Sequence, residues 1–272
     1  MPQPQSQDSD SPRLRVATVI LNANRWDGTG RAAAEVAERL AQRHEVHLFA
    51  RTVDGMRLDG IRWHCVPGPR WPDVVDFASF VPLCGAMLSG RGFDVVHSHG
   101  CNVLGANVYT VQNVEPAKRA ALEALGRGER VALPRRLTRR AFHAAVCAAE
   151  RRAYRPTARP TPWLIAVSRG TARDLSSHYA VDPQRLRIIP NGVDLDTFRP
   201  CRDAAERQRV RRDLGLSDDD FVAVFSGGDW HRKGLEHAIA AIALIPDPAV
   251  KLLVLEVFAN PVDGADQAAL SF

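Results

Sequence analysis

The sequence predicts an α/β protein: one complete domain with a doubly wound parallel sheet, followed by the start of a second domain of the same kind. Three observations support this class. Apolar runs of strand length alternate with amphipathic helical segments, turn-forming residues follow several of these runs, and the pattern restarts at Phe221 after a charged segment. Strands separated by helices at this spacing indicate βαβ units and therefore a parallel sheet.

The strands are expected where apolar residues run together, because a parallel strand is buried on both faces. The first run, residues 15–21, reads Arg-Val-Ala-Thr-Val-Ile-Leu. Further strands are expected at residues 45–50, 61–66, 93–98, 107–112, 163–167, 187–189, 221–224 and 250–255.

Helices are expected between these strands. In residues 31–42 the apolar side chains of Ala33, Val36, Ala37 and Leu40 recur on one face. Pro134 suits a first helical turn, Ser168 suits an N-cap, and Pro82 limits the first turns of its helix. The remaining helices are expected at residues 77–89, 134–154, 169–179, 202–214 and 234–244.

Composition places the chain among water-soluble globular proteins. Its 272 residues are 45% hydrophobic and 25% charged, and no apolar run approaches the length of about 20 residues that spans a bilayer. Residues 1–12 are polar and lack an apolar core, so we expect a disordered tail and no signal peptide. The five cysteines are scattered and never form a Cys-x-x-Cys pair, which favours buried thiols in a reducing compartment over disulfides or zinc.

The net charge of +5 is concentrated in one region, residues 118–159. Its acidic residues are Glu123, Glu129 and Glu150. One interpretation is a solvated basic surface, and another is attachment to anionic lipid headgroups at the inner face of the cell membrane. Nucleic acid is not an expected partner, because the sequence shows no nucleic-acid-binding signature. The cations are Lys118, Arg119, Arg127, Arg130, Arg135, Arg136, Arg139, Arg140, Arg151, Arg152, Arg155 and Arg159.

The segment 225–234 is the strongest candidate for a ligand site. Gly227 and Gly228 follow an expected strand, and Arg232 and Lys233 precede an expected helix. Backbone N–H groups, a helix N-terminus and two cations can bind one anion together. Cations at a helix start oppose the helix dipole, so we interpret the pair as a phosphate or diphosphate site.

Two further candidates follow strands that end at the ligand-binding edge of such a sheet. The loop containing Gly28, Thr29 and Gly30 either contacts a ligand or is a tight turn, and alanines replace the third glycine of a dinucleotide-binding fingerprint. His97 and His99 lie on one face of their strand by alternation. We expect His99 to make a polar contact with a substrate hydroxyl, because no convincing third ligand completes a metal site.

Residues 188–200 read Ile-Ile-Pro-Asn-Gly-Val-Asp-Leu-Asp-Thr-Phe-Arg-Pro. Asn191 and Gly192 predict a turn, and Asp194 and Asp196 can accept hydrogen bonds from local backbone donors. On residue chemistry alone this segment is a structured linker between two sheets.

Residues 188–200, residues 227–235 and the step from Val167 to Ser168 resemble the GT-B glycosyltransferases, most closely family 4 of the retaining type. The resemblance extends over residues 15–255. It implies two Rossmann-like domains that transfer a sugar from a nucleotide-diphosphate donor to a glycan or lipid acceptor. The domains are expected at residues 13–200, on the acceptor side, and 201–272, on the nucleotide-sugar side.

The resemblance also implies roles for individual residues. Arg232 and Lys233 would neutralise the leaving diphosphate, so that neither metal nor cofactor is required, and Gly227 and Gly228 would belong to the donor-phosphate loop. Gly28, Thr29 and Gly30 would lie near the donor phosphates and the acceptor, and Asn191 belongs to the interdomain segment. Gln112 stands where the family usually has a histidine close to the reacting sugar, and His99 is the candidate that compensates.

The end of the chain departs from the family pattern. The family's second domain continues with a Glu-x7-Glu motif that residues 256–272 do not contain, so we expect a C-terminally truncated chain. Three hypotheses remain at this point. They are a cytoplasmic glycosyltransferase of surface polysaccharide or glycolipid synthesis, a catalytically impaired remnant acting as a binding module, and a nicotinamide-dependent oxidoreductase. The last is disfavoured because the dinucleotide fingerprint is absent.

Overall fold

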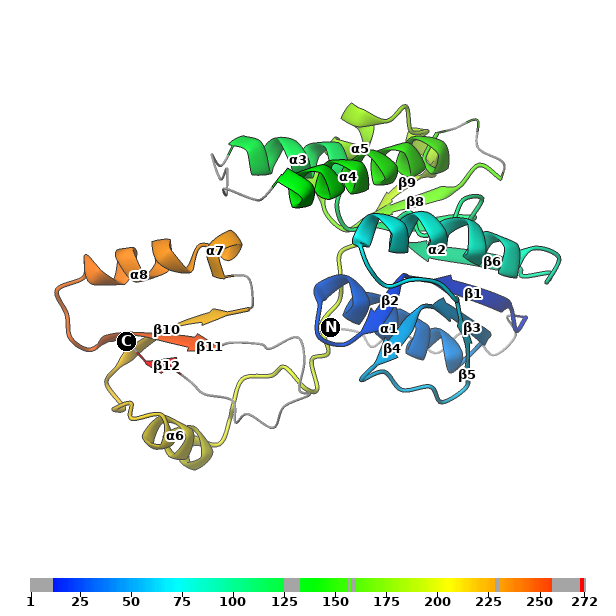
Figure 1. The fold of residues 1–272 in the computed structure, drawn as a ribbon. Coiled ribbons are helices and arrows are strands. Elements are labelled where there is room, and N and C mark those ends of the chain that lie inside the picture. The colour runs from blue at the N-terminus through cyan, green and yellow to red at the C-terminus, as the bar shows by residue number, and fades with distance from the viewer. Residues whose placement is uncertain are drawn as a thin grey trace. The chain divides into compact units, whose positions relative to one another are not determined.

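The computed structural model describes residues 12–124, 133–155, 157, 160–227, 230–255 and 270–271. The chain divides into two compact units, the first reaching Gly192 and the second beginning at Val193 (Figure 1). Each unit is an α/β structure and is described by itself.

The first unit contains a seven-stranded sheet in the order β5-β3-β1-β6-β7-β8-β9, and every neighbouring pair is parallel. The predicted doubly wound sheet is thereby confirmed, with its switch point between β1 and β6, where the strand order reverses. The strands are β1 (Arg15–Val19), β3 (Glu45–Ala50), β5 (Ile61–Cys65), β6 (Val95–His99), β7 (Val108–Val111), β8 (Trp163–Ala166) and β9 (Leu186–Ile188).

The helices of the first unit are α1 (Gly28–Ala41), α2 (Asp73–Leu88), α3 (Glu115–Ala124), α4 (Leu133–Ala153) and α5 (Arg169–His178), with a 3₁₀ turn at Pro183–Arg185. α1 begins three residues earlier than expected, because the side chain of Asp27 caps it and the glycines form its first turn. α2 also begins earlier, at Asp73, and it accommodates Pro82 in its interior. A small two-stranded sheet, β2 (Asn22–Asn24) and β4 (Thr52–Asp54), was not predicted.

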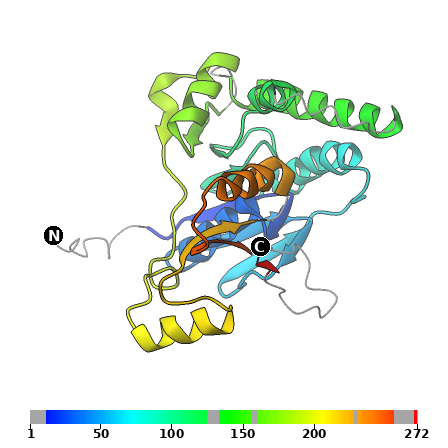
Figure 2. The same ribbon diagram turned by 90° about the vertical axis from the view of Figure 1, so that its left-hand side faces the viewer.

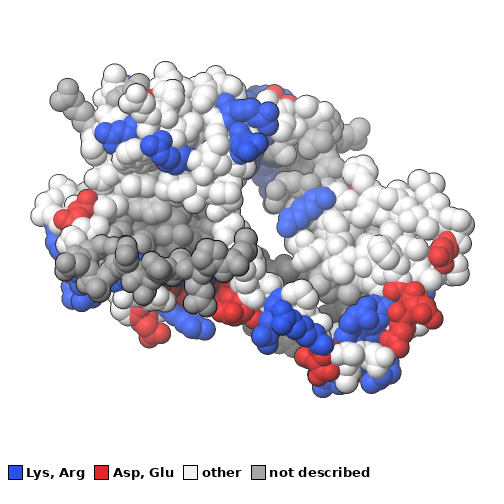
Figure 3. All heavy atoms as spheres, turned by 180° about the vertical axis from the view of Figure 1, so that it is seen from behind, with Lys and Arg blue, Asp and Glu red and all other residues white. Residues whose placement is uncertain are grey.

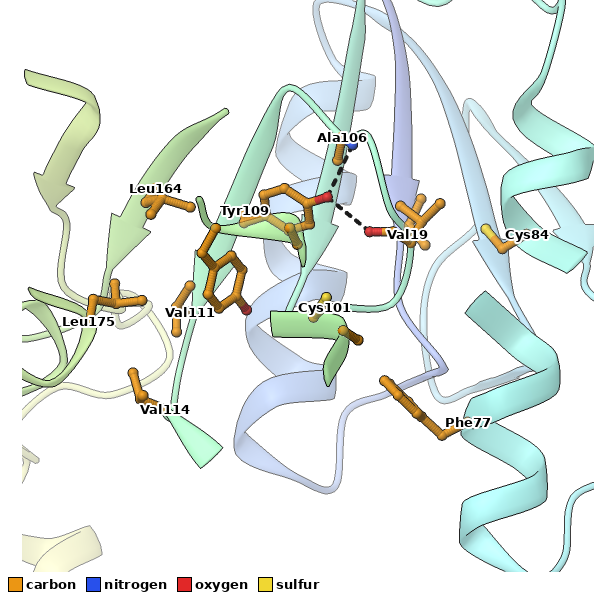
Figure 4. Close-up of a cluster of buried hydrophobic side chains, with 14 of the residues drawn as sticks. Val19, Phe77, Cys84, Cys101, Ala106, Tyr109, Val111, Val114, Leu164 and Leu175 are labelled. Carbon is orange, nitrogen blue, oxygen red and sulfur yellow. Dashed lines mark hydrogen bonds between the residues drawn. The ribbon is translucent and has the colours of Figure 1, made fainter. Parts of the chain in front are cut away.

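Two hydrophobic clusters hold this unit together. The alanine face of α1 packs on Val46, Leu48 and Ala50 of β3. The larger cluster joins the strands to side chains of α2, α4 and α5 (Figure 4). At its centre the hydroxyl of Tyr109 donates to the backbone oxygen of Val103 and accepts from the N–H of Ala106, so this buried polar group is satisfied.

The second unit contains a three-stranded sheet in the order β10-β11-β12. β10 and β11 are parallel, and β12 pairs antiparallel with β11. Leu235, Leu252 and Val254 form its buried core beneath α8. Its elements are α6 (Ala204–Asp213), β10 (Phe221–Ser226), α7 (Trp230–Lys233), α8 (Leu235–Ala243), β11 (Val250–Leu255) and β12 (Leu270–Ser271).

All five cysteines are free, in agreement with the prediction of thiols. Cys84, Cys101 and Cys147 are buried as expected, whereas Cys65 and Cys201 are exposed.

Candidate functional site

The first group of candidate residues follows the carboxyl ends of β1, β6, β7 and β9, which lie at one edge of the parallel sheet. At the start of α1, Asp27 Oδ1 accepts a hydrogen bond of 2.7 Å from the N–H of Gly30. Asn24 Oδ1 in turn accepts from the backbone N–H groups of Trp26 and Asp27. This network fixes the entry of the chain into the helix and leaves the first turn built from Gly28, Thr29 and Gly30.

The two glycines of this turn have different surroundings. A Cβ at Gly30 would lie 2.9 Å from Asn24 Cγ and from the backbone oxygen of Asn24, so only glycine fits. A Cβ at Gly28 would meet no atom within 4 Å. Gly30 is therefore required for packing, and the open space at Gly28 is where a ligand could approach the helix N-terminus.

The imidazoles of His97 and His99 lie together as strand alternation predicted, with ring centroids 4.4 Å apart. His97 Nε2 is 2.8 Å from Thr110 Oγ1 on β7, and burial lowers the pKa of His97 to about 4. His99 is only 2% exposed, and burial together with the neighbouring His97 holds its pKa well below the usual range. Burial therefore favours the neutral form of both rings.

His99 has a further property that distinguishes it from His97. Among the described residues, neither of its ring nitrogens has a hydrogen-bond partner. A buried polar group without a partner costs on the order of 1–3 kcal/mol, so such groups are rare without a reason. A neutral imidazole can donate one hydrogen bond and accept another. The structure encloses this imidazole within the first unit and leaves both of its polar atoms unused.

Gln112 and Asn191 form a pair that the sequence did not reveal. The Nε2 of Gln112 donates to Asn191 Oδ1 at 3.1 Å, and Asn191 Nδ2 donates back to Gln112 Oε1 at 3.0 Å. The two residues follow β7 and β9 and are separated by 79 positions. The pair ties the end of β7 to the Asn-Gly turn and holds both carboxamides at this edge. In that segment Asp194 accepts hydrogen bonds from Asp196 and Thr197, as expected of a structured linker.

The second group lies in the second unit, where β10 ends. Gly227 has a φ of +134°, and its N–H donates to the backbone oxygen of Leu255 at 3.2 Å. Lys233 and its neighbours form the four-residue helix α7, which was not predicted. Gly234, with a φ of +82°, then separates α7 from α8.

The side chain of Lys233 extends back toward Gly227. A Cβ at Gly227 would collide with the Nζ, Cε and Cδ atoms of Lys233, so the absence of a side chain lets the ammonium approach the backbone at the end of β10. Among the described residues Lys233 forms no ion pair. Gly228 and the side chain of Arg232 lie outside the described part of the chain, although the backbone of Arg232 belongs to α7.

The predicted residues thus form two groups. Gly28, Thr29, Gly30, His99, Gln112 and Asn191 belong to the first unit, and Gly227 and Lys233 to the second. Two residues that support the site were missed, Asn24 and Asp27. Asp27 could have been found, because an aspartate directly before a helix is a preferred N-cap.

A parallel α/β unit with polar groups at its strand ends is joined to a second α/β unit with a lysine over a glycine turn, which is the arrangement that the resemblance to the GT-B glycosyltransferases implies. Comparison with known proteins supports this class. The chain matches the model of Glycosyltransferase Family 4 over residues 26–197. The chain therefore belongs to this family.

Curated relatives and solved structures agree with the assignment. The chain is 30% identical over 258 residues to D-inositol 3-phosphate glycosyltransferase 1 of Catenulispora acidiphila, covering 85% of this chain and 57% of that protein. It is 38% identical over 94 residues to the D-inositol 3-phosphate glycosyltransferase of Xylanimonas cellulosilytica, covering 34% of this chain and 22% of that protein. The chain thus spans 57% or less of both relatives.

Among solved structures the fold resembles WaaG, a glycosyltransferase involved in lipopolysaccharide biosynthesis, with a TM-score of 0.71 at 21% identity, covering 89% of this chain and 64% of that one. It also resembles Anabaena HepE in complex with UDP-glucose, with a TM-score of 0.58 at 13% identity, covering 91% and 62%. At these identities the similarity shows the shared fold.

Proposed function

We propose that this chain takes part in retaining glycosyl transfer from a nucleotide-diphosphate sugar to a glycan or lipid acceptor. The observation that carries the proposal is the lysine ammonium placed over the glycine turn where β10 ends. The carboxyl end of a parallel strand is where α/β folds bind ligands, and a cation there that has no ion pair within the described residues suits an anionic ligand. Anabaena HepE, which shares the fold, binds UDP-glucose and UDP.

The chemistry gives Lys233 a role beyond binding. In glycosyl transfer the anomeric carbon becomes oxocarbenium-like, while the departing diphosphate oxygen gains negative charge. A fixed positive charge beside that oxygen stabilises the transition state more than the ground state. Lys233, with Arg232, supplies this charge without a metal ion in the proposed reaction.

The first unit is proposed as the acceptor side. Gly28 and Thr29 offer an open helix N-terminus, and the paired carboxamides of Gln112 and Asn191 can hydrogen-bond sugar hydroxyls. His99 is proposed as a neutral hydrogen-bonding group, because its two ring nitrogens have no partner within the described residues and a group that reaches the buried strand end would satisfy them. In this arrangement residues 13–200 hold the acceptor and residues 201–272 the donor.

The experiment that tests this function is a transfer assay with isotope-labelled sugar nucleotides on the full chain and on Lys233→Ala. We expect transfer or donor hydrolysis that is unaffected by a chelator and falls at least about tenfold in the variant, the loss expected for one charge-assisted contact. Turnover that persists unchanged in Lys233→Ala contradicts the assigned role.

A second candidate is a binding module without turnover. One observation favours it: Phe221 and Val224 of β10 are 68% and 58% exposed, although parallel strands of this kind are normally covered. A chain that binds nucleoside diphosphate but neither transfers nor hydrolyses any donor would identify this alternative.

The basic helix α4 supports a further part of the proposal, contact with an anionic membrane at the inner face of the cell. Residues 133–141 are all exposed, and they include Leu133 and Leu137 beside Arg135, Arg136, Arg139 and Arg140. Figures 1 and 2 show the green segment α3–α4 reaching past the strands of the first sheet. Each cation near an anionic surface contributes about 1 kcal/mol, and the leucines can enter the interface.

In the described part of the chain, no helix has the length and apolarity that crossing a bilayer requires. Co-sedimentation with phosphatidylglycerol-containing vesicles tests the membrane proposal. Binding should fall in Arg135→Gln/Arg139→Gln, and equal binding to neutral phosphatidylcholine vesicles would refute it.

A further inference from the structure

A groove lies on the first unit between the C-terminal ends of α4 and α5. Arg151, Arg152 and Ala148 of α4 line it together with Arg155, and so do His178, Tyr179 and Ala180 at the end of α5. Its volume of about 630 Å³ falls within the range of small-molecule sites, about 300–1,000 Å³.

The groove carries uncompensated positive charge. Among the described residues, no carboxylate pairs with Arg151, Arg152, Arg155 or His178, and none lines the groove. Cations at helix C-termini do neutralise the helix dipole, but two helix ends offer only about one negative charge together, against three guanidinium groups. Figure 3 shows one face of the molecule, on which several groups of basic side chains stand without acidic neighbours.

A hydrogen bond and a ring contact fix the position of Tyr179, one of the residues that line the groove. The hydroxyl of Tyr179 donates a 2.6 Å hydrogen bond to Glu150 Oε2, which also accepts from the backbone N–H of Glu115 at 3.1 Å. The ring of Tyr179 meets Tyr154 edge to face at 5.7 Å. The two hydrogen bonds of Glu150 come from Tyr179 and Glu115, and within the described residues it forms no ion pair with an arginine of the groove.

The groove is separate from the candidate glycosyl-transfer site. α4 leads into the start of β8 at Trp163, and α5 leads toward the start of β9, so both helix ends lie at the amino-terminal edge of the sheet. The residues assigned to transfer lie at the opposite edge. The guanidinium groups of Arg185 and Arg187 add charge at the amino-terminal edge, each 4.8 Å from the ring centroid of Trp163.

We propose that this groove is a second anion site, which binds a phosphate or diphosphate group independently of glycosyl transfer. Guanidinium groups form paired, charge-assisted hydrogen bonds with phosphate oxygens, and three of them on adjacent turns can surround one such group. The ligand is either a soluble phosphate ester or a lipid headgroup, since both present the same oxygens.

The test uses inorganic pyrophosphate as the probe in isothermal titration of the full chain. All measurements are made in the Lys233→Ala background, so that the proposed donor site does not contribute. We expect one binding site whose affinity falls at least about tenfold in Arg151→Gln/Arg155→Gln. The matched control is Arg169→Gln/Arg173→Gln, which removes the same charge from exposed positions of α5 outside the groove and should leave the affinity within about twofold.

The proposal is overturned if pyrophosphate binds the groove variant as tightly as its parent, or if the control variant loses as much affinity. Vesicles containing phosphatidylglycerol then identify the source of the phosphate group. If the groove variant loses pyrophosphate but keeps vesicle binding, the ligand is a soluble phosphate ester. If it loses both, the ligand is a lipid headgroup.

Discussion

Replacing Glu150 by glutamine should change how the stability of the first unit depends on pH. The Glu150 side chain is buried, at 4% exposure, and burial raises its pKa to about 7 from an ordinary value near 4.5. The hydrogen bonds from Tyr179 and from the N–H of Glu115 oppose this shift but do not cancel it. The folded state therefore holds the proton more tightly than the unfolded state does.

The sign and size of this effect on the free energy of unfolding follow from the linkage between proton binding and folding. For an acid whose pKa is raised on folding, the favourable contribution is complete below about pH 4.5 and is lost as the pH rises through about 7. The shift corresponds to about 3 kcal/mol, because each pKa unit is worth about 1.4 kcal/mol. Glu150→Gln cannot ionise, so its free energy of unfolding should lack this loss.

Urea unfolding followed by tyrosine and tryptophan fluorescence between pH 4.5 and 8 provides the measurement. The difference in unfolding free energy between Glu150→Gln and the parent chain should change by up to about 3 kcal/mol across this range, in favour of the variant at high pH. Glu123→Gln, an exposed glutamate on α3, is the control and should change by no more than about 0.5 kcal/mol. If the plots of unfolding free energy against pH are parallel for Glu150→Gln and the parent chain, the reasoning is refuted.

Three other perturbations test separate features. Burial lowers the pKa of His97 to about 4, so protonation of His97 should lower the free energy of unfolding as the pH falls from about 6.5 through 4. His97→Gln should remove that loss in the same urea titrations. Gly30→Ala should destabilise the first unit by about 1–3 kcal/mol, because the added Cβ would press on Asn24. Gly28→Ala adds a Cβ in open space and should leave the stability unchanged or raise it, and thermal unfolding measures both effects. A double-mutant cycle on Gln112→Ala and Asn191→Ala should give a coupling of about 0.5–1.5 kcal/mol, and additive effects would show that the carboxamides do not interact in solution.

Much of the fold could be predicted because strands such as β1, β10 and β11 consist mostly of apolar residues. The strand expected at residues 250–255 occurs as β11, Val250–Leu255, and the N-cap expected at Ser168 accepts from the N–H of Thr171. Errors occurred at glycines near helix starts. Gly28 and Gly30 belong to α1, which was expected to begin at residue 31, and Gly234, expected as the first residue of a helix, lies between α7 and α8.

The candidate site was predictable only in part. Local pattern placed Lys233 just after a strand and put His97 and His99 on one face of another. The carboxamide pair joins residues 79 positions apart, and no local signal encodes such a contact. The burial of His99 likewise depends on packing by distant segments, which alternation along one strand cannot report.

The binding of a nucleoside diphosphate at Lys233 tests the central claim most directly. UDP and GDP are titrated calorimetrically into the full chain in the Arg151→Gln/Arg155→Gln background, with Lys233→Ala as the variant and Lys251→Ala as the control. The account predicts that one of the two nucleotides binds, that Lys233→Ala weakens it at least about tenfold, and that Lys251→Ala does not. Equal affinity in the Lys233→Ala chain and its parent would contradict it.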